Sequence, residues 1–230
     1  MNTEIDQIKQ RYVKRVQLDG IYSFTKPDVY MAQQEKEREI IRWIIKSNIG
    51  SLENVRLLEI GCGGGKNLLS LLQWGFSAKN LVGNELLTDR VQSAKKLLPS
   101  DIQIIEGDAM LLDFKGDLFD VVYQSTVFTS ILDDNFQKKL AEKMWSLLRP
   151  GGWILWYDFV YDNPTNKDVK GVPYKKIVAL FPEGKITVRR LTLAPPISRI
   201  VTKIHPQVYT ACNIFPFLRT HLLCGIQKPN

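Results

Sequence analysis

The chain has 230 residues, of which 44% are hydrophobic and 24% are charged, and these values exclude a disordered, collagen-like or coiled-coil protein. The formal net charge is +7, and its excess lies in residues 159–230, which carry 11 basic and 3 acidic side chains. No apolar run approaches the roughly 18 residues that span a membrane, and the start of the chain lacks the layout of a signal peptide. We therefore expect a cytoplasmic protein without a transmembrane segment.

Residues 1–50 predict an N-terminal arm and a lid helix. Isoleucines at helical spacing indicate an amphipathic helix over 32–47. These isoleucines are Ile40, Ile41, Ile44 and Ile45. The preceding arm is less regular and rich in aromatic residues, namely Tyr12, Tyr22, Phe24 and Tyr30.

Residues 51–230 predict one α/β domain, because short apolar runs alternate with helical patterns. The first five strands are expected at 55–60, 80–85, 102–106, 118–124 and 152–158. Helices are expected at 67–74 and 135–148, and Arg149-Pro150-Gly151-Gly152 should end the second one. The rest of the chain predicts a loop over 162–173, a short helix near 174–180, a strand near 186–193, a helical stretch near 197–212 and a last strand near 220–227. Seven strands in one open sheet are therefore expected.

A glycine cluster follows the first strand and opens the first helix of this domain. Such a turn brings bare backbone close to a ligand beside a helix N-terminus. A dinucleotide fingerprint would need glycine where Lys66 stands, and a phosphate-binding P-loop would need Ser or Thr where Asn67 stands. The spacing fits an acidic-x-Gly-x-Gly-x-Gly pattern instead. Its members are Glu59, Gly61, Gly63 and Gly65.

The run Glu59-Ile60-Gly61-Cys62-Gly63-Gly64-Gly65 resembles motif I of class I S-adenosylmethionine-dependent methyltransferases. Three further stretches match that family in order, at 81–85, 106–109 and 147–152, and the resemblance covers about residues 53–160. It implies a Rossmann-like, open, seven-stranded and mostly parallel sheet with helices on both faces and an antiparallel last strand. It also implies S-adenosylmethionine as cofactor and S-adenosylhomocysteine as product.

The resemblance assigns roles to residues at the ends of the first four strands. Glu85 would bind the ribose hydroxyls, at a spacing usual for a ribose carboxylate, and Asp108 would meet the adenine amino group. Glu59 would orient the loop or the amino group of the ligand. The remaining implied cofactor contacts are Gly61, Cys62, Gly63, Gly65, Leu86, Ala109, Gln124 and Ser125, with Tyr22 of the arm over the cofactor. Loop capping by Glu59 and a turn role for Asp108 stay open as alternatives.

A base near the acceptor would assist methyl transfer to a hydroxyl group. Asp158 is the candidate base, because it closes the fifth strand at the edge where ligands of such sheets bind. His205 is a weaker candidate, as is His221, since neither belongs to a recognisable motif. No metal site is expected, because Cys62, Cys212 and Cys224 form no CxxC pair, and none of them has the context of a nucleophilic cysteine.

The acceptor is expected to be a hydroxyl of a sugar or small metabolite, because the Asn/Asp-Pro-Pro motif of amino-methylating enzymes is absent after the fourth strand. The insert 159–185 should border its pocket. The basic last third is consistent with an anionic small acceptor, a membrane-associated one, nucleic acid, or merely a solvated face. An RNA-modifying enzyme and a non-catalytic protein that binds the cofactor remain the alternatives, with nucleic acid the less expected partner.

Overall fold

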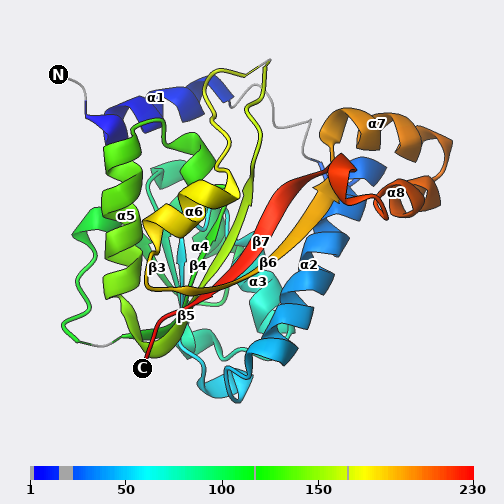
Figure 1. The fold of residues 1–230 in the computed structure, drawn as a ribbon. Helices are drawn as coiled ribbons and strands as arrows, with labels where there is room; N and C mark the ends of the chain where they lie inside the picture. Colours follow the sequence, from blue (N-terminus) through cyan, green and yellow to red (C-terminus); the bar gives the residue numbers. More distant parts are fainter. Residues whose placement is uncertain (1–2, 16–22, 117, 165) are drawn as a thin grey trace.

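The computed structural model describes residues 3–15, 23–116, 118–164 and 166–230. Seven strands form one sheet in the spatial order β3-β2-β1-β4-β5-β7-β6 (Figure 1). They are β1 (Leu57–Ile60), β2 (Leu81–Glu85), β3 (Gln103–Glu106), β4 (Phe119–Ser125), β5 (Leu148–Phe159), β6 (Lys185–Leu193) and β7 (Arg219–Gln227). Neighbours from β3 to β5 are parallel, whereas β7 is antiparallel to both β5 and β6. The predicted sheet, with its antiparallel last strand, is confirmed.

Helices cover both faces of this sheet (Figure 1). They are α1 (Glu4–Arg15), α2 (Pro27–Ser47), α3 (Lys66–Gln73), α4 (Thr88–Leu97), α5 (Asp134–Ser146), α6 (Tyr174–Leu180), α7 (Pro195–Ile204) and α8 (Pro206–Cys212). One apolar cluster joins the sheet to α1, α5 and α6, and a second joins it to α2, α3 and α4. Every residue of β1 and β2 is buried, including Glu59, Asn84 and Glu85, which explains why neither strand alternates apolar and polar residues.

The N-terminal region is more helical than predicted. The expected irregular arm contains α1, and α2 begins at Pro27 rather than near residue 32. Proline is well suited to the first turn of a helix, where its missing N–H leaves no bond unmade. α2 packs against β6, β7, α7 and α8, and this helix therefore covers elements from the last third of the chain. The division of the chain near residue 50 stays a prediction.

Two boundaries in the second half differ from the prediction. The helical stretch near 197–212 is two helices, because His205 takes an extended conformation before Pro206. β5 begins at Leu148, four residues early, since Leu148 already pairs with Phe119 of β4 across an irregular register. The run Arg149-Pro150-Gly151-Gly152 therefore lies within the strand as the structure defines it.

The carboxyl ends of the parallel strands meet at one edge of the sheet. The strand order reverses beside β1, which has β2 on one side and β4 on the other. Ligands of open α/β sheets bind in the crevice at such a reversal. Figure 1 shows α1 lying across this edge. Among the described helices, none has the length and apolarity that a membrane crossing requires.

Candidate functional site

The loop after β1 contains three glycines with positive φ angles, and two of them also allow close packing. A Cβ on Gly61 would lie 2.6 Å from Cγ2 of Val127, and a Cβ on Gly65 would lie 2.6 Å from Cδ1 of Leu98. These two glycines let neighbouring elements pack against the loop. A Cβ on Gly63 would meet no described atom within 4 Å, so the bare backbone of Gly63 faces open space.

Glu85, the last residue of β2, directs its carboxylate to this loop. Its Oε2 accepts a hydrogen bond from the amide of Gly63 (2.8 Å), and its Oε1 accepts one from the amide of Leu87 (2.9 Å). The amide of Cys62 also donates to the carbonyl oxygen of Asn84 at 2.9 Å. The glycine loop and the end of β2 are thus one hydrogen-bonded unit.

The end of β3 is held to the end of β2 by a buried amide. Asn84 Nδ2 donates to the carbonyl oxygens of Ile105 (3.3 Å) and Gly107 (3.0 Å). Asp108 follows and caps the short helix η4 (Ala109–Leu111), because its Oδ1 accepts from the amide of Met110 at 2.9 Å. Asp108 therefore has a turn role in the structure while lying at the same sheet edge as Glu85.

A buried polar network, which the sequence analysis missed, links β1 to α3 and α2. Oε1 of Glu59 accepts from Asn67 Nδ2 at 2.6 Å, and Oδ1 of Asn67 accepts from Lys36 Nζ at 3.0 Å. Burial raises the pKa of Glu59 to about 7 and lowers the pKa of Lys36 to about 8. Oε2 of Glu59 has no hydrogen-bond partner among the described residues. The signal for Lys36 in the sequence was its position one helical turn before Ile40, on the apolar face of the predicted helix.

β4 ends in a tight turn beside the glycine loop. The side chain of Gln124 is buried, and its Oε1 accepts from the amide of Val127 at 3.0 Å. Thr126 has a φ of +59°, a conformation that is costly for a residue with a Cβ, and its amide donates to the carbonyl oxygen of Tyr157 at 2.8 Å. Ser125 lies between these two residues and is half-buried.

Asp158 lies at the end of β5 beneath the short helix η5 (Phe128–Ser130), and only 1% of it is exposed. Its Oδ2 accepts from the amide of Thr129 (3.2 Å), and its Oδ1 accepts from its neighbour Phe159 N–H (3.1 Å). Burial raises the pKa of Asp158 to about 7, although these bonds favour the ionised form. The carboxylate of Asp158 therefore stabilises the connection between β4 and α5 through its hydrogen bond from Thr129.

Residues 58–156 match a family model described as a methyltransferase domain, and this range includes the glycine loop, Glu85 and Asp108. Solved structures agree in fold. A structure of an S-adenosylmethionine-dependent methyltransferase from Archaeoglobus fulgidus is 16% identical with a TM-score of 0.58, and the match covers 87% of this chain and 100% of that one. Residues 58–156 are therefore a methyltransferase domain, and the chain has the fold of S-adenosylmethionine-dependent methyltransferases.

Two further proteins are similar to this chain. A sterol 4-C-methyltransferase from Caenorhabditis elegans is 26% identical over 153 residues, which cover 66% of this chain and 45% of that enzyme. The chain therefore spans less than half the length of that curated relative. The solved structure of an S-adenosylmethionine-bound amino pentose methyltransferase from Micromonospora echinaspora is 15% identical with a TM-score of 0.58, and the match covers 84% of this chain and 90% of that one.

α1 of the methyltransferase bridges the two sides of the strand reversal. On the β4 side, the Tyr12 hydroxyl lies 3.1 Å from Oγ of Ser130, and Arg11 donates to the Ser130 carbonyl oxygen at 3.2 Å. On the β2 side, the guanidinium of Arg90 in α4 lies 4.4 Å from the ring centre of Tyr12. Tyr22, the predicted arm residue over the cofactor, lies outside the described residues.

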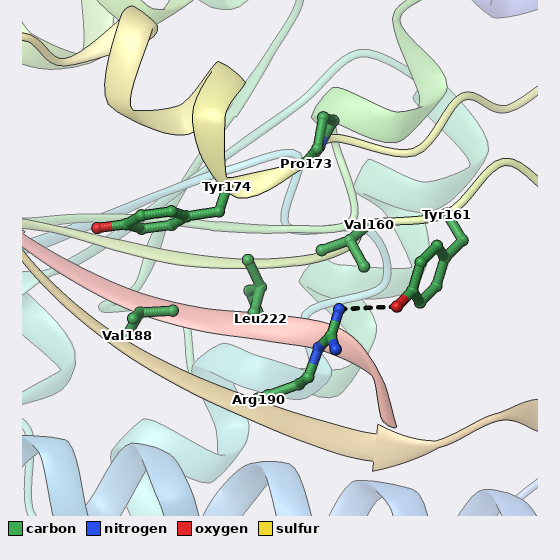
Figure 2. A pocket seen from close by; sticks show the side chains of 7 residues that line it. All are labelled: Val160, Tyr161, Pro173, Tyr174, Val188, Arg190 and Leu222. Carbon is green, nitrogen blue, oxygen red and sulfur yellow. Dashed lines mark hydrogen bonds between the residues drawn. The ribbon is translucent and has the colours of Figure 1, made fainter. Parts of the chain in front are cut away.

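An open cavity of about 460 Å³ lies on the β6–β7 side of the methyltransferase (Figure 2). Seven residues line it, namely Val160, Tyr161, Pro173, Tyr174, Val188, Arg190 and Leu222. Figure 2 shows Arg190 reaching from β6 to the Tyr161 hydroxyl, to which Nη2 donates at 2.8 Å. The lining is mainly apolar, with one cation and two phenols. Four of these residues, Val160, Tyr161, Pro173 and Tyr174, lie within residues 159–185, and the other three lie on β6 and β7.

Along the chain, the two histidines lie far beyond the glycine loop, after β6. His205 is exposed between α7 and α8, and its Nδ1 accepts from the amide of Gln207 at 3.2 Å, which makes it a helix cap. His221 on β7 stacks on Tyr157 with ring centres 5.0 Å apart, and burial lowers its pKa to about 3. Within the described ranges, no group of three or more His, Cys, Asp or Glu side chains is arranged to hold a metal ion.

Proposed function

We propose that this chain transfers the methyl group of S-adenosylmethionine to a hydroxyl of a small metabolite whose apolar body occupies the cavity beside β6 and β7. The observation that carries the proposal is the position of this cavity relative to the glycine loop. Leu222 in its floor pairs with Asp158 of β5 and with Arg190 of β6, so the cavity begins about two strand spacings, roughly 10 Å, from β4. A metabolite of that length can reach from the cavity to the end of β4.

The ends of β1 to β4 fit the cofactor. The open space over Gly63 lets backbone approach a ligand closely, and the Glu85 carboxylate beside it can accept from two ribose hydroxyls by charge-assisted hydrogen bonds. Asp108 with the amide of Ala109 would bind the adenine. Glu59 would act through Asn67 on the loop. The other proposed contacts are Gly61, Cys62, Gly65, Leu86, Gln124 and Ser125.

When bound, S-adenosylmethionine supplies a methyl group on a positively charged sulfur atom, and the protein contributes mainly by bringing the acceptor into line with it. We propose that α1 is the lid over this site, since Tyr12 and Arg11 attach it to η5 and Arg90 attaches it to α4. Asp158 stays the candidate base. Its position under η5 favours a second role, in which it fixes the turn at the end of β4.

The cavity lining favours a particular chemistry for the acceptor. Val160, Val188 and Leu222 offer apolar surface to a hydrocarbon body, which is consistent with similarity to enzymes named for sterols. Arg190 can bind a carboxylate, phosphate or hydroxyl group, because no carboxylate among the described residues forms a salt bridge with it. This lining supports a metabolite with an apolar body more strongly than a bare sugar or an RNA strand.

Transfer of tritiated methyl from S-adenosylmethionine into fractionated cell extract tests the proposal. We expect label in an organic-soluble small-metabolite fraction, and label in RNA alone would contradict it. With the acceptor in hand, Arg190→Ala should raise KM for the acceptor about tenfold without changing S-adenosylhomocysteine affinity. Arg189→Ala is the matched control, because Arg189 is the neighbouring residue of β6 and contacts Glu39 of α2 instead. Equal effects of the two variants would remove Arg190 from the acceptor site.

A further inference from the structure

The surface helix α7 buries two hydroxyl side chains and exposes two isoleucines. Ser198 and Thr202 are buried, whereas Ile200 and Ile204 are 65% and 74% exposed. The buried hydroxyls need no outside partner, because Oγ of Ser198 donates to the Pro195 carbonyl oxygen at 3.1 Å and Oγ1 of Thr202 donates to the Ser198 carbonyl oxygen at 2.7 Å. An ordinary surface helix buries its apolar stripe instead. The exposed isoleucines of α7 therefore indicate an apolar environment on the outside.

The chain segment after α8 adds three more exposed apolar side chains. Ile214, Phe215 and Phe217 are 68%, 51% and 72% exposed, and the two phenyl rings lie 5.7 Å apart between centres. Figure 1 shows α7 and α8 as a lobe that projects from the β6–β7 side of the sheet. We call Ile200, Ile204, Ile214, Phe215 and Phe217 the apolar tip of this lobe. Side chains of this kind gathered on one projection usually mark an interaction site.

The stretch of chain that contains the apolar tip has charged side chains of a single sign. The chain contains no Asp or Glu after Glu183. The basic residues in that stretch are Lys185, Arg189, Arg190, Arg199, Lys203, Arg219 and Lys228. Arg199 and Lys203 are exposed on α7, next to Ile200 and Ile204 in the sequence. Arg199 forms a salt bridge with Asp28 of α2 at 3.9 Å. The surface that complements the lobe is therefore apolar and anionic.

We propose that the α7–α8 lobe docks on the surface of an anionic lipid bilayer. The apolar tip enters the boundary between headgroups and acyl chains, and Arg199 and Lys203 lie at the level of the phosphates. An amphipathic helix with basic and bulky apolar residues binds membranes in this way, lying in the interface without spanning the bilayer. Each basic residue close to an anionic membrane adds roughly 1 kcal/mol of attraction. The proposal does not depend on which acceptor the enzyme methylates.

Sedimentation of the full chain with lipid vesicles tests the proposal. We expect binding to phosphatidylcholine vesicles that contain phosphatidylglycerol, weaker binding as salt rises, and little binding to phosphatidylcholine alone. The double variant Ile204→Ser with Phe217→Ser should bind the anionic vesicles at least tenfold more weakly. Lys203→Gln should weaken binding about fivefold, the equivalent of 1 kcal/mol.

The matched control is Ile45→Ser with Leu97→Ser, which removes two exposed apolar side chains from α2 and α4. This control should bind vesicles like the parent chain, and all variants should keep their affinity for S-adenosylhomocysteine, which shows that they are folded. The proposal fails if the parent chain does not sediment with anionic vesicles at low salt, or if the tip variant sediments as well as the control. A dimer in light scattering that only the tip variant loses would assign the tip to a second copy of the chain instead.

Discussion

The two halves of the sheet offer different surfaces to a ligand. At the ends of β1, β2 and β4, the surface offered to a ligand is mostly backbone, positioned by glycines and by strand-end side chains such as Glu85. At β6 and β7, the surface is made of side chains from two strands and a long connection, around the open cavity with Arg190. The chain before residue 159 has nearly balanced charge, whereas residues 159–230 carry the basic excess.

The proposed function accounts for this difference. A cofactor shared by a whole family needs the same donors and acceptors every time, and a backbone loop with a carboxylate 20 residues later provides them in a fixed geometry. Acceptors differ between enzymes, so their pocket is built from side chains that can change without disturbing the strands. Substitutions in the two halves should therefore separate cofactor affinity from acceptor affinity.

The strongest test of this separation is Glu85→Ala. We expect affinity for S-adenosylhomocysteine, measured by calorimetry, to fall about 100-fold, because charge-assisted hydrogen bonds are each worth roughly 1.5–3 kcal/mol. The control is Glu106→Ala, since Glu106 is the residue of β3 in register with Glu85 and bonds only the Thr88 hydroxyl among the described residues. Similar losses in both variants would show that Glu85 has no special part in cofactor binding.

The second test concerns the network under the glycine loop. Asn67→Ala should lower the free energy of unfolding by about 2 kcal/mol, because Lys36 and Glu59 would be left buried without their shared partner. Denaturant unfolding measures this change. Ser70→Ala is the control, because Ser70 also joins α3 to α2, through Glu37, but at a more exposed position. Its effect should stay within about 0.5 kcal/mol, and an equally small effect of Asn67→Ala would contradict a structural role for the network.

The sequence was most informative where function requires a fixed backbone. Gly61, Gly63 and Gly65 could be assigned to a loop because positive φ angles and close packing leave few other residues possible. Strand-end positions such as Glu85 followed from the alternation of strands and helices. Seven strands in one open sheet could be predicted for the same reason, whereas the antiparallel direction of the last strand was implied by the family resemblance.

Contacts that depend on how distant elements pack could not be predicted. Lys36 reaches Asn67 only because α2 lies against α3, and no local pattern fixes that packing. The cavity combines the connection after β5 with β6 and β7, whose residues have no fixed spacing from one another. Helix boundaries were predicted wrongly where a single proline determines the first residue of a helix, as at Pro27 and Pro206.

The third test separates the two roles of Asp158, at the junction of the two halves. The pKa of Asp158 is raised from 3.8 to about 7, so the folded chain binds this proton more tightly than the unfolded chain. The resulting stability is fully present below about pH 4 and is lost as the pH rises through 7. The stability of the parent chain relative to Asp158→Asn should therefore fall over this range, by at most about 1.4 kcal/mol per pH unit. Thermal unfolding of both proteins at several pH values measures it, and a constant difference would mean that the carboxylate stays ionised throughout.

The activity of the same variant decides whether Asp158 is also the base. A base role predicts that Asp158→Asn lowers kcat much more than cofactor affinity and removes the rise of kcat with pH near 7. A role confined to holding η5 predicts a normal pH profile at temperatures where the variant is folded. Normal turnover would leave the acceptor half without a base from this strand.

The smallest expected effect concerns α1, the proposed lid over the cofactor half. Tyr12→Phe removes the hydroxyl that lies 3.1 Å from Oγ of Ser130 but keeps the ring beneath Arg90. One such hydrogen bond is worth about 1 kcal/mol, so S-adenosylhomocysteine should dissociate about fivefold faster in stopped-flow measurements. Tyr30→Phe is the matched control, because it removes a hydroxyl that bonds only to Gln34 on the exposed side of α2 within the described chain. If α1 covers the cofactor, only Tyr12→Phe changes the dissociation rate, and the KM for the acceptor stays the same, because the acceptor cavity borders the insert after β5 rather than α1. Equal rates in the parent chain and Tyr12→Phe would mean that α1 stabilises η5 without controlling access to the site.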